Sequence, residues 1–70
     1  MTLQDAVLTV CRQRRTSMRA LALAAGIEPG LFNAYVHGKR PNQRNAERVA
    51  AILDMDPRHL FQDFDQLRPY

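Results

Sequence analysis

The stretch Met18–His37, MRALALAAGIEPGLFNAYVH, decides the fold of this 70-residue chain. Its first half is rich in helix-forming alanine and leucine, and its apolar face comprises Leu21, Ala22 and Ala25. Gly26 then ends the helix, because glycine accepts the positive φ that a tight helix exit needs. The apolar residues spaced to face back onto the first helix are Ile27, Phe32 and Tyr35. We therefore expect a helix-turn-helix, with the outward side chains of its second helix as candidates for contacting a DNA groove.

Periodicity and capping residues place the neighbouring helix boundaries. A first helix is expected over about residues 3–14, where a stripe at i, i+4, i+7 and i+8 comprises Leu3, Val7, Val10, Cys11 and Arg14. Ser17 caps the second helix. The third begins at Pro29, whose missing N–H is no loss in a first turn, and ends at Gly38. Glu28 precedes it as a weaker cap than Ser or Asp.

The C-terminal third of the chain predicts two more helices and no strand. Asn42 caps a fourth helix that continues to about Asp54, with inward positions at Ala46, Val49, Ala50 and Leu53. Asp56, followed by a proline, caps a short fifth helix. Residues 63–70 show no periodicity and are expected to be irregular, with Phe64 as an aromatic anchor.

Length and composition favour one small all-α domain over residues 1–70, with a core at about 3–61 and a C-terminal tail at 62–70. The lone Cys11 excludes an internal disulfide and is expected to be a core residue, and the two histidines have no zinc-like spacing. No transmembrane run or leader pattern is present, so a cytoplasmic location is expected. The residue inventory predicts no enzyme, cofactor, metal or small-molecule ligand, because neither a catalytic arrangement nor a Gly-rich phosphate loop is found.

Positive charge is concentrated on and around the helix-turn-helix. The net charge is +3, but residues 12–48 carry eight basic side chains against two acidic ones. From Asp54 onward four aspartates oppose two arginines. This separation of basic and acidic residues favours one face that binds nucleic acid and an opposite face that does not. The alternative is that both are ordinary solvated surfaces.

The order of elements, together with residues distributed over positions 3–61, resembles the lambda-repressor-like (XRE-type) family of DNA-binding domains, which includes phage Cro and repressor proteins. The matching residues are Ser17, Leu21, Ala22, Ala25, Gly26, Ile27, Phe32, Tyr35, Gly38, Lys39, Arg40, Pro41, Val49, Ala50, Leu53, Asp56 and Leu60. The resemblance implies a five-helix domain whose second and third helices form the helix-turn-helix. It also implies a homodimer that binds duplex DNA at an inverted-repeat operator and regulates transcription.

Three departures from the family pattern stand out. Met18 occupies a place where members often have a glutamine that reaches a phosphate. Pro29 and Gly30 stand where polar side chains commonly meet base edges. Cys11 and Val36 replace a frequent Arg–Glu pair, a swap of a buried ion pair for apolar packing that is often neutral or stabilising by ~1–4 kcal/mol.

Five residues at the start of the third helix are the candidates for base contacts: Glu28, Gly30, Leu31, Asn33 and Ala34. Asn33 can bond adenine bidentately, Glu28 can accept from a cytosine amine, and Leu31 or Ala34 can pack on a thymine methyl. The alternatives are that Asn33 is merely solvated and that Glu28 serves the helix start, the role we favour for it.

Candidates for phosphate contacts are more numerous: Ser17, Arg19, His37, Lys39, Arg40, Asn42 and Arg44. They comprise cationic or polar side chains and two helix starts whose N–H groups can receive phosphate oxygens. A solvated helix end is the favoured interpretation of Arg12, Arg14 and Arg15.

Two functions of different classes remain. The favoured one is a dimeric, repressor-like DNA-binding regulator. The apolar side chains of Leu60, Phe61 and Phe64 are more than so small a core needs, which favours a dimer contact. The alternative is a helix-turn-helix scaffold used for protein contact, as in an antirepressor or antitoxin, for which the weakly polar segment 28–31 or the acidic tail provides the surface.

Overall fold

At the start of each α-helix, a side-chain oxygen accepts a hydrogen bond from the backbone of the first turn. The computed structural model describes residues 2–70, and in that range it is all-helical, with five α-helices, one 3-10 helix and no strand. The bounds are α1 Leu3–Arg14, α2 Met18–Ala25, α3 Pro29–Val36, α4 Gln43–Ile52, α5 Pro57–Leu60 and η1 Phe64–Gln66. The predicted caps Ser17, Asn42 and Asp56 are confirmed, and Thr2 caps α1 in the same way.

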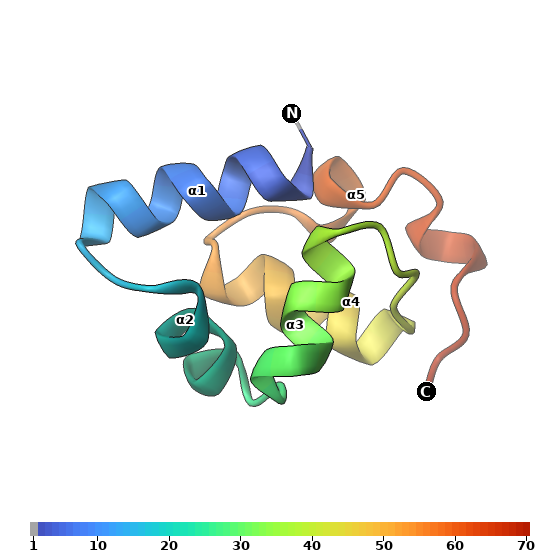
Figure 1. Ribbon diagram of the computed structural model, residues 1–70. Coiled ribbons are helices and arrows are strands. Elements are labelled where there is room, and N and C mark those ends of the chain that lie inside the picture. Colours follow the sequence, from blue (N-terminus) through green and yellow to red (C-terminus); the bar gives the residue numbers. More distant parts are fainter. Residues whose placement is uncertain (1) are drawn as a thin grey trace.

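The helix packing centres on α2 and α4. Figure 1 shows α1 along one side, α2 and α3 across the front, and α5 with the C-terminal segment at the other end. α2 packs against α1, α3 and α4, while α4 also contacts α5 and η1. Gly26 ends α2 with φ +75°, as its position predicts.

The core lies where these helices cross. Phe32, Val7 and Val49 are its largest fully buried side chains. Ala22 and Ala46 have no exposed surface, which places small side chains where helices approach one another. Cys11 is half-buried and packs against the main cluster, to which Val36 belongs, as expected for apolar replacements.

Residues 62–70 contribute to the core, contrary to expectation. η1 buries Phe64, and Leu67 after it is only 4% exposed. Both pack with Ala46, and Phe61 contacts this cluster and the main one. The core therefore extends to Leu67. The expected surplus of apolar side chains is also wrong, because Phe64 is buried and Leu60 and Phe61 pack against the core.

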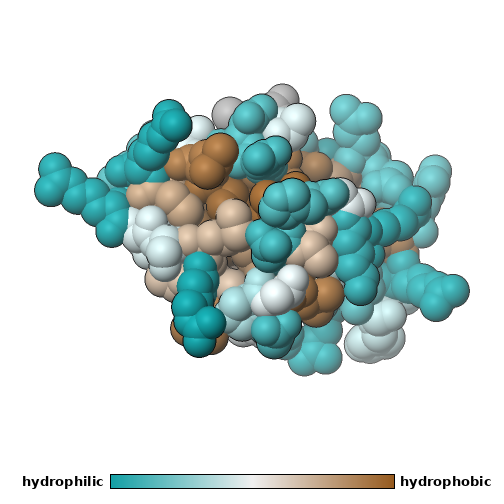
Figure 2. Space-filling view, viewed as in Figure 1, coloured by the Kyte–Doolittle hydropathy of each residue, from teal (hydrophilic) through white to brown (hydrophobic). Residues whose placement is uncertain are grey.

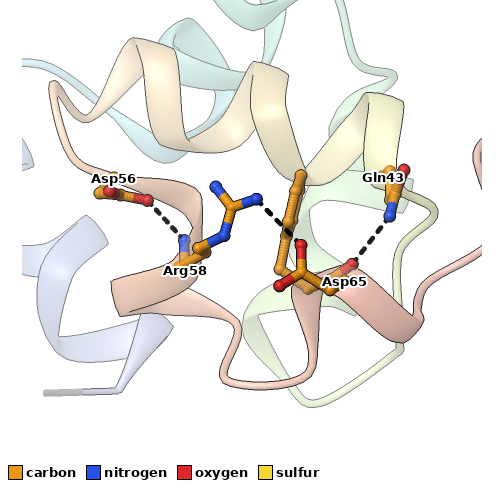
Figure 3. A network of polar contacts seen from close by, with 5 residues as sticks. Gln43, Asp56, Arg58 and Asp65 are labelled. Atoms are coloured by element: carbon orange, nitrogen blue, oxygen red, sulfur yellow. Dashed lines mark hydrogen bonds and ion pairs between the residues drawn. The ribbon is translucent and has the colours of Figure 1, made fainter.

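Gln43 and Arg58 tie this C-terminal segment to α4 and α5 (Figure 3). The Gln43 side-chain amide donates to the carbonyl of Phe64 at 3.1 Å, and the Gln43 backbone N–H donates to the carbonyl of Arg68. The Arg58 guanidinium lies 5.1 Å from the centre of the Phe64 ring and pairs with Asp65 at 2.9 Å. Polar contacts thus supply the order that hydrophobic periodicity did not indicate.

Two helix ends differ slightly from expectation. α3 ends at Val36, with His37 as its C-cap, and not at Gly38. α4 ends at Ile52, with Asp54 just beyond it at φ +56°. Arg14, expected on the inward stripe of the first helix, is exposed and donates to the carbonyl of Ile52 at 2.7 Å.

Among residues 2–70 no helix has the length and apolar character needed to cross a membrane.

Candidate nucleic-acid interface

One face of α3 is exposed along the whole helix. Gly30, Asn33 and His37 are exposed and share this face at i, i+3 and i+7. Leu31 and Ala34 are half-buried at its margin. The Asn33 side chain therefore stands at the centre of the exposed face, whereas Leu31 packs partly against the core and offers less surface to a ligand.

Glu28 is committed to the start of α3. Its two carboxylate oxygens accept from the backbone N–H groups of Gly30 and Leu31, each at 2.9 Å. These two hydrogen bonds, aided by the nearby Arg19 guanidinium, lower the pKa of Glu28 below its usual range. The favoured role at the helix start is confirmed, and the cap is stronger than expected because both oxygens are used. Its carboxylate is correspondingly less free for a base amine.

Gly30 makes room for that carboxylate. A Cβ at this position would lie 2.9 Å from a Glu28 carboxylate oxygen, closer than real side chains approach. The absence of a side chain at the start of the exposed α3 face therefore leaves space for the Glu28 cap.

The candidates on α2 and at the start of α4 are exposed or half-buried. Ser17 accepts from Ala20 N–H at 3.1 Å as the N-cap of α2, and Arg19 is exposed in its first turn. Asn42 accepts from Asn45 N–H at 2.7 Å as the N-cap of α4, and Arg44 is exposed one residue into that helix. Both capping side chains are thus engaged with their own helices.

The loop after α3 carries Lys39 and Arg40, and His37 precedes it as the C-cap of α3. His37 Nδ1 donates to the Asn33 carbonyl at 2.8 Å in the tautomer that protonates that nitrogen. Lys39 is exposed and its backbone N–H donates to the carbonyl of Ala34 at 2.9 Å, which holds the loop against α3. Arg40 is also exposed, but its guanidinium pairs with Asp63 at 2.7 Å.

The expected separation of basic and acidic surfaces is therefore incomplete. Asp63 and Asp65 of the C-terminal segment pair with Arg40 and Arg58. Because Asp63 reaches the loop after α3, a carboxylate lies beside the proposed phosphate contacts. Figure 2 shows hydrophilic side chains projecting around and across this face of the molecule, with tan and brown hydrophobic surface between them.

Arg68 is a candidate that the sequence analysis did not identify. It lines an open cleft of about 650 Å³ beside Lys39, Arg40 and Asn42. In sequence it belongs to the acidic tail, and only the return of that tail to α4 places it here. Within residues 2–70, no group of three or more His, Cys, Asp and Glu side chains has the proximity to hold a metal ion.

Comparison of the chain with protein-family models, with curated proteins and with solved structures finds no match.

Proposed function

We propose that this chain is a cytoplasmic, sequence-specific regulator of transcription that binds duplex DNA, a small repressor of phage or mobile-element type. In this proposal α2, the turn at Gly26 and α3 act as a helix-turn-helix, with α3 in the major groove. The observation that carries it is the exposed face of α3, which has Arg19 of α2 near Glu28 at its start and Lys39 and Arg40 in the loop that follows it. No enzymatic step and no cofactor is part of this function.

Asn33 is the side chain best suited to read a base. It is exposed at the centre of the α3 face, and an amide can bond adenine bidentately, which discriminates by ~1–3 kcal/mol. Lys39, Arg19 and Arg44 are assigned to the phosphate backbone, where they position the protein without reading sequence. One such amide per subunit provides modest specificity, so sequence-dependent DNA shape contributes the remainder.

The proposed regulator acts as a homodimer on an inverted repeat, since two half-sites double a weak code. The resemblance to the lambda-repressor-like family supports this state. The side chains first considered for the dimer contact, Leu60, Phe61 and Phe64, pack within the protomer and do not support it. Among the large apolar side chains, Leu8, Leu23 and Tyr70 are the exposed ones.

A second candidate function, contact with a protein partner, is favoured by the state of Glu28. Its carboxylate is held by α3, and its neighbours Pro29 and Gly30 carry no side-chain donor. This leaves Asn33 as the principal polar group for base contact on the face. An antirepressor or antitoxin would use the same face without needing a base code.

The test is selection of the purified protein against a randomised duplex library at moderate salt. We expect an enriched inverted repeat with half-site centres about one helical turn, ~34 Å, apart. Asn33→Ala should relax the preference at one base pair per half-site. Gln13→Ala, which removes an exposed amide from α1, is the matched control and should leave the preference unchanged.

Absence of any enriched sequence would overturn the regulator and favour the protein-contact function. Equal loss of binding to selected and random duplexes by Asn33→Ala would reject the assigned role of that residue alone.

A further inference from the structure

An open cleft of about 650 Å³ lies between α3, the start of α4 and the C-terminal segment. Its charged lining consists of Lys39, Arg40 and Arg68, and its polar lining includes Asn42 and Asn45. No carboxylate is among the lining residues. The cleft therefore presents positive charge from two segments that are far apart in the sequence.

The backbone at Arg68 and before it is anchored. Gln43 N–H donates to the Arg68 carbonyl at 2.6 Å, and the Gln43 side-chain amide donates to the Phe64 carbonyl at 3.1 Å. Leu67 is buried immediately before Arg68. Figure 1 shows the C-terminal segment, in red, running beside the start of α4. The exposed Arg68 side chain is thus carried by an ordered segment and loses less freedom on binding than a side chain on a mobile tail.

Charge pairing leaves two of the three cations available. Arg40 is paired with Asp63, and Arg58, outside the cleft, is paired with Asp65. Within residues 2–70 neither Lys39 nor Arg68 has a carboxylate within ion-pair distance. Two exposed cations without a carboxylate partner line the same cleft, so their positive potentials add there and favour an anion beside them.

We propose that Arg68 binds the phosphate backbone of duplex DNA together with Lys39, so that the C-terminal segment forms part of the DNA interface. This inference rests on the proposed function and extends its phosphate contacts from the loop after α3 to the chain's last residues. The anchored Arg68 then acts as a clamp on the backbone at the edge of the groove contacted by α3.

The experiment measures binding of a random duplex by fluorescence anisotropy between about 50 and 200 mM salt for the full chain and four variants. Loss of one phosphate contact lowers the magnitude of the negative slope of log K against log salt by about 0.9. It also weakens binding about eightfold near 100 mM. We expect this for Arg68→Ala and for Lys39→Ala, with Arg68→Lys close to the unchanged protein. Arg12→Ala removes the same charge from an exposed site at the C-terminal end of α1 and should not change the slope.

The variants also need to remain folded. Gln43 contacts the backbone carbonyl of Arg68, so replacing the side chain leaves that hydrogen bond in place, and unchanged thermal unfolding verifies this. As a second measure, backbone amide NMR shifts of Leu67 and Arg68 should move on adding duplex DNA.

The outcomes separate the two proposals. If the unchanged protein shows no salt-dependent binding to duplex DNA, both the proposed function and this inference are wrong. If Lys39→Ala lowers the slope while folded Arg68→Ala matches the unchanged protein or the Arg12→Ala control, the inference is overturned and the proposed function stands.

Discussion

At the scale of single residues, Glu28 shows how a helix start and a recognition surface compete for one side chain. The carboxylate accepts two N–H groups that would otherwise lack partners in the first turn of α3. A glutamate two residues before a glycine can fold back in this way because no Cβ obstructs it. The start of α3 is therefore built for helix stability, and in the proposed function base contact depends on Asn33, further along the helix.

The lowered pKa of Glu28 predicts a pH-dependent contribution to stability. The charged form is favoured in the folded state, so the stabilisation is present above the usual carboxyl value of 4.5 and disappears as the pH falls through the lower folded value. Glu28→Gln should therefore lower the melting temperature at pH 7, and the difference from the unchanged protein should shrink as the pH falls through the lowered pKa of Glu28.

Glu47→Gln is the matched control for Glu28, since Glu47 is exposed within α4 and makes no contact with a helix start. We expect no comparable loss at pH 7 for this variant. A Glu28→Gln protein that melts with the unchanged protein at pH 7 would show that the two hydrogen bonds do not stabilise α3.

At the scale of elements, the contact between the loop after α3 and the segment after α5 restrains DNA binding in the proposed function. Asp63 pairs with Arg40 at 2.7 Å and places a negative charge next to the phosphate contacts. Asp63→Asn should tighten binding to any duplex about two- to fivefold, corresponding to roughly 0.5–1 kcal/mol for an exposed ion pair. Thermal unfolding should change little, because the Arg40 and Asp63 side chains are 60% and 43% exposed.

Asp65→Asn removes the same charge from the same segment and releases Arg58, which does not line the cleft beside α3. Affinity measured for both variants at one salt concentration distinguishes a local effect from one of net charge. Equal tightening by the two changes would argue against a specific role of the Arg40–Asp63 pair.

The elements that sequence could predict are those with local determinants. Ser17, Asn42 and Asp56 each precede a helical pattern, and a cap needs only residues a few positions away. Gly26 likewise marks its turn through its own φ preference. The burial of Leu67 was not predictable, because a short segment without periodicity is ordered here by contacts with α4 more than twenty residues earlier.

In the candidate site, too, features with local determinants could be predicted from the sequence and features that depend on distant segments could not. Exposure of Asn33 follows from helical periodicity, since Phe32, Tyr35 and Val36 occupy the opposite, core-facing side of α3. The pairing of Arg40 with Asp63 and the position of Arg68 beside Lys39 depend on where the C-terminal segment returns, and no local pattern encodes that. For this reason, charge counts along the chain placed Asp63 and Arg68 together on a separate acidic surface.

At the scale of the whole molecule, the C-terminal segment connects stability with the proposed DNA interface. A chain of 70 residues buries a smaller fraction of its surface on folding than a larger domain does. Each buried side chain is therefore a large share of its core. Phe64 and Leu67 complete the core against Ala46, and the same segment carries Asp63 and Arg68 to the proposed DNA-binding face. Loosening this segment should therefore reduce both stability and DNA affinity.

Leu67→Ala tests this connection. Removing a buried leucine side chain costs about 2–5 kcal/mol, a large part of the ~5–15 kcal/mol typical of folded domains, so the urea midpoint should fall sharply. Leu23→Ala, at a site 59% exposed, is the matched control and should change stability by no more than about 0.5 kcal/mol. If Leu67→Ala unfolds at the same urea concentration as Leu23→Ala, the C-terminal segment does not contribute to the core in solution, and the anchoring of Arg68 loses its basis.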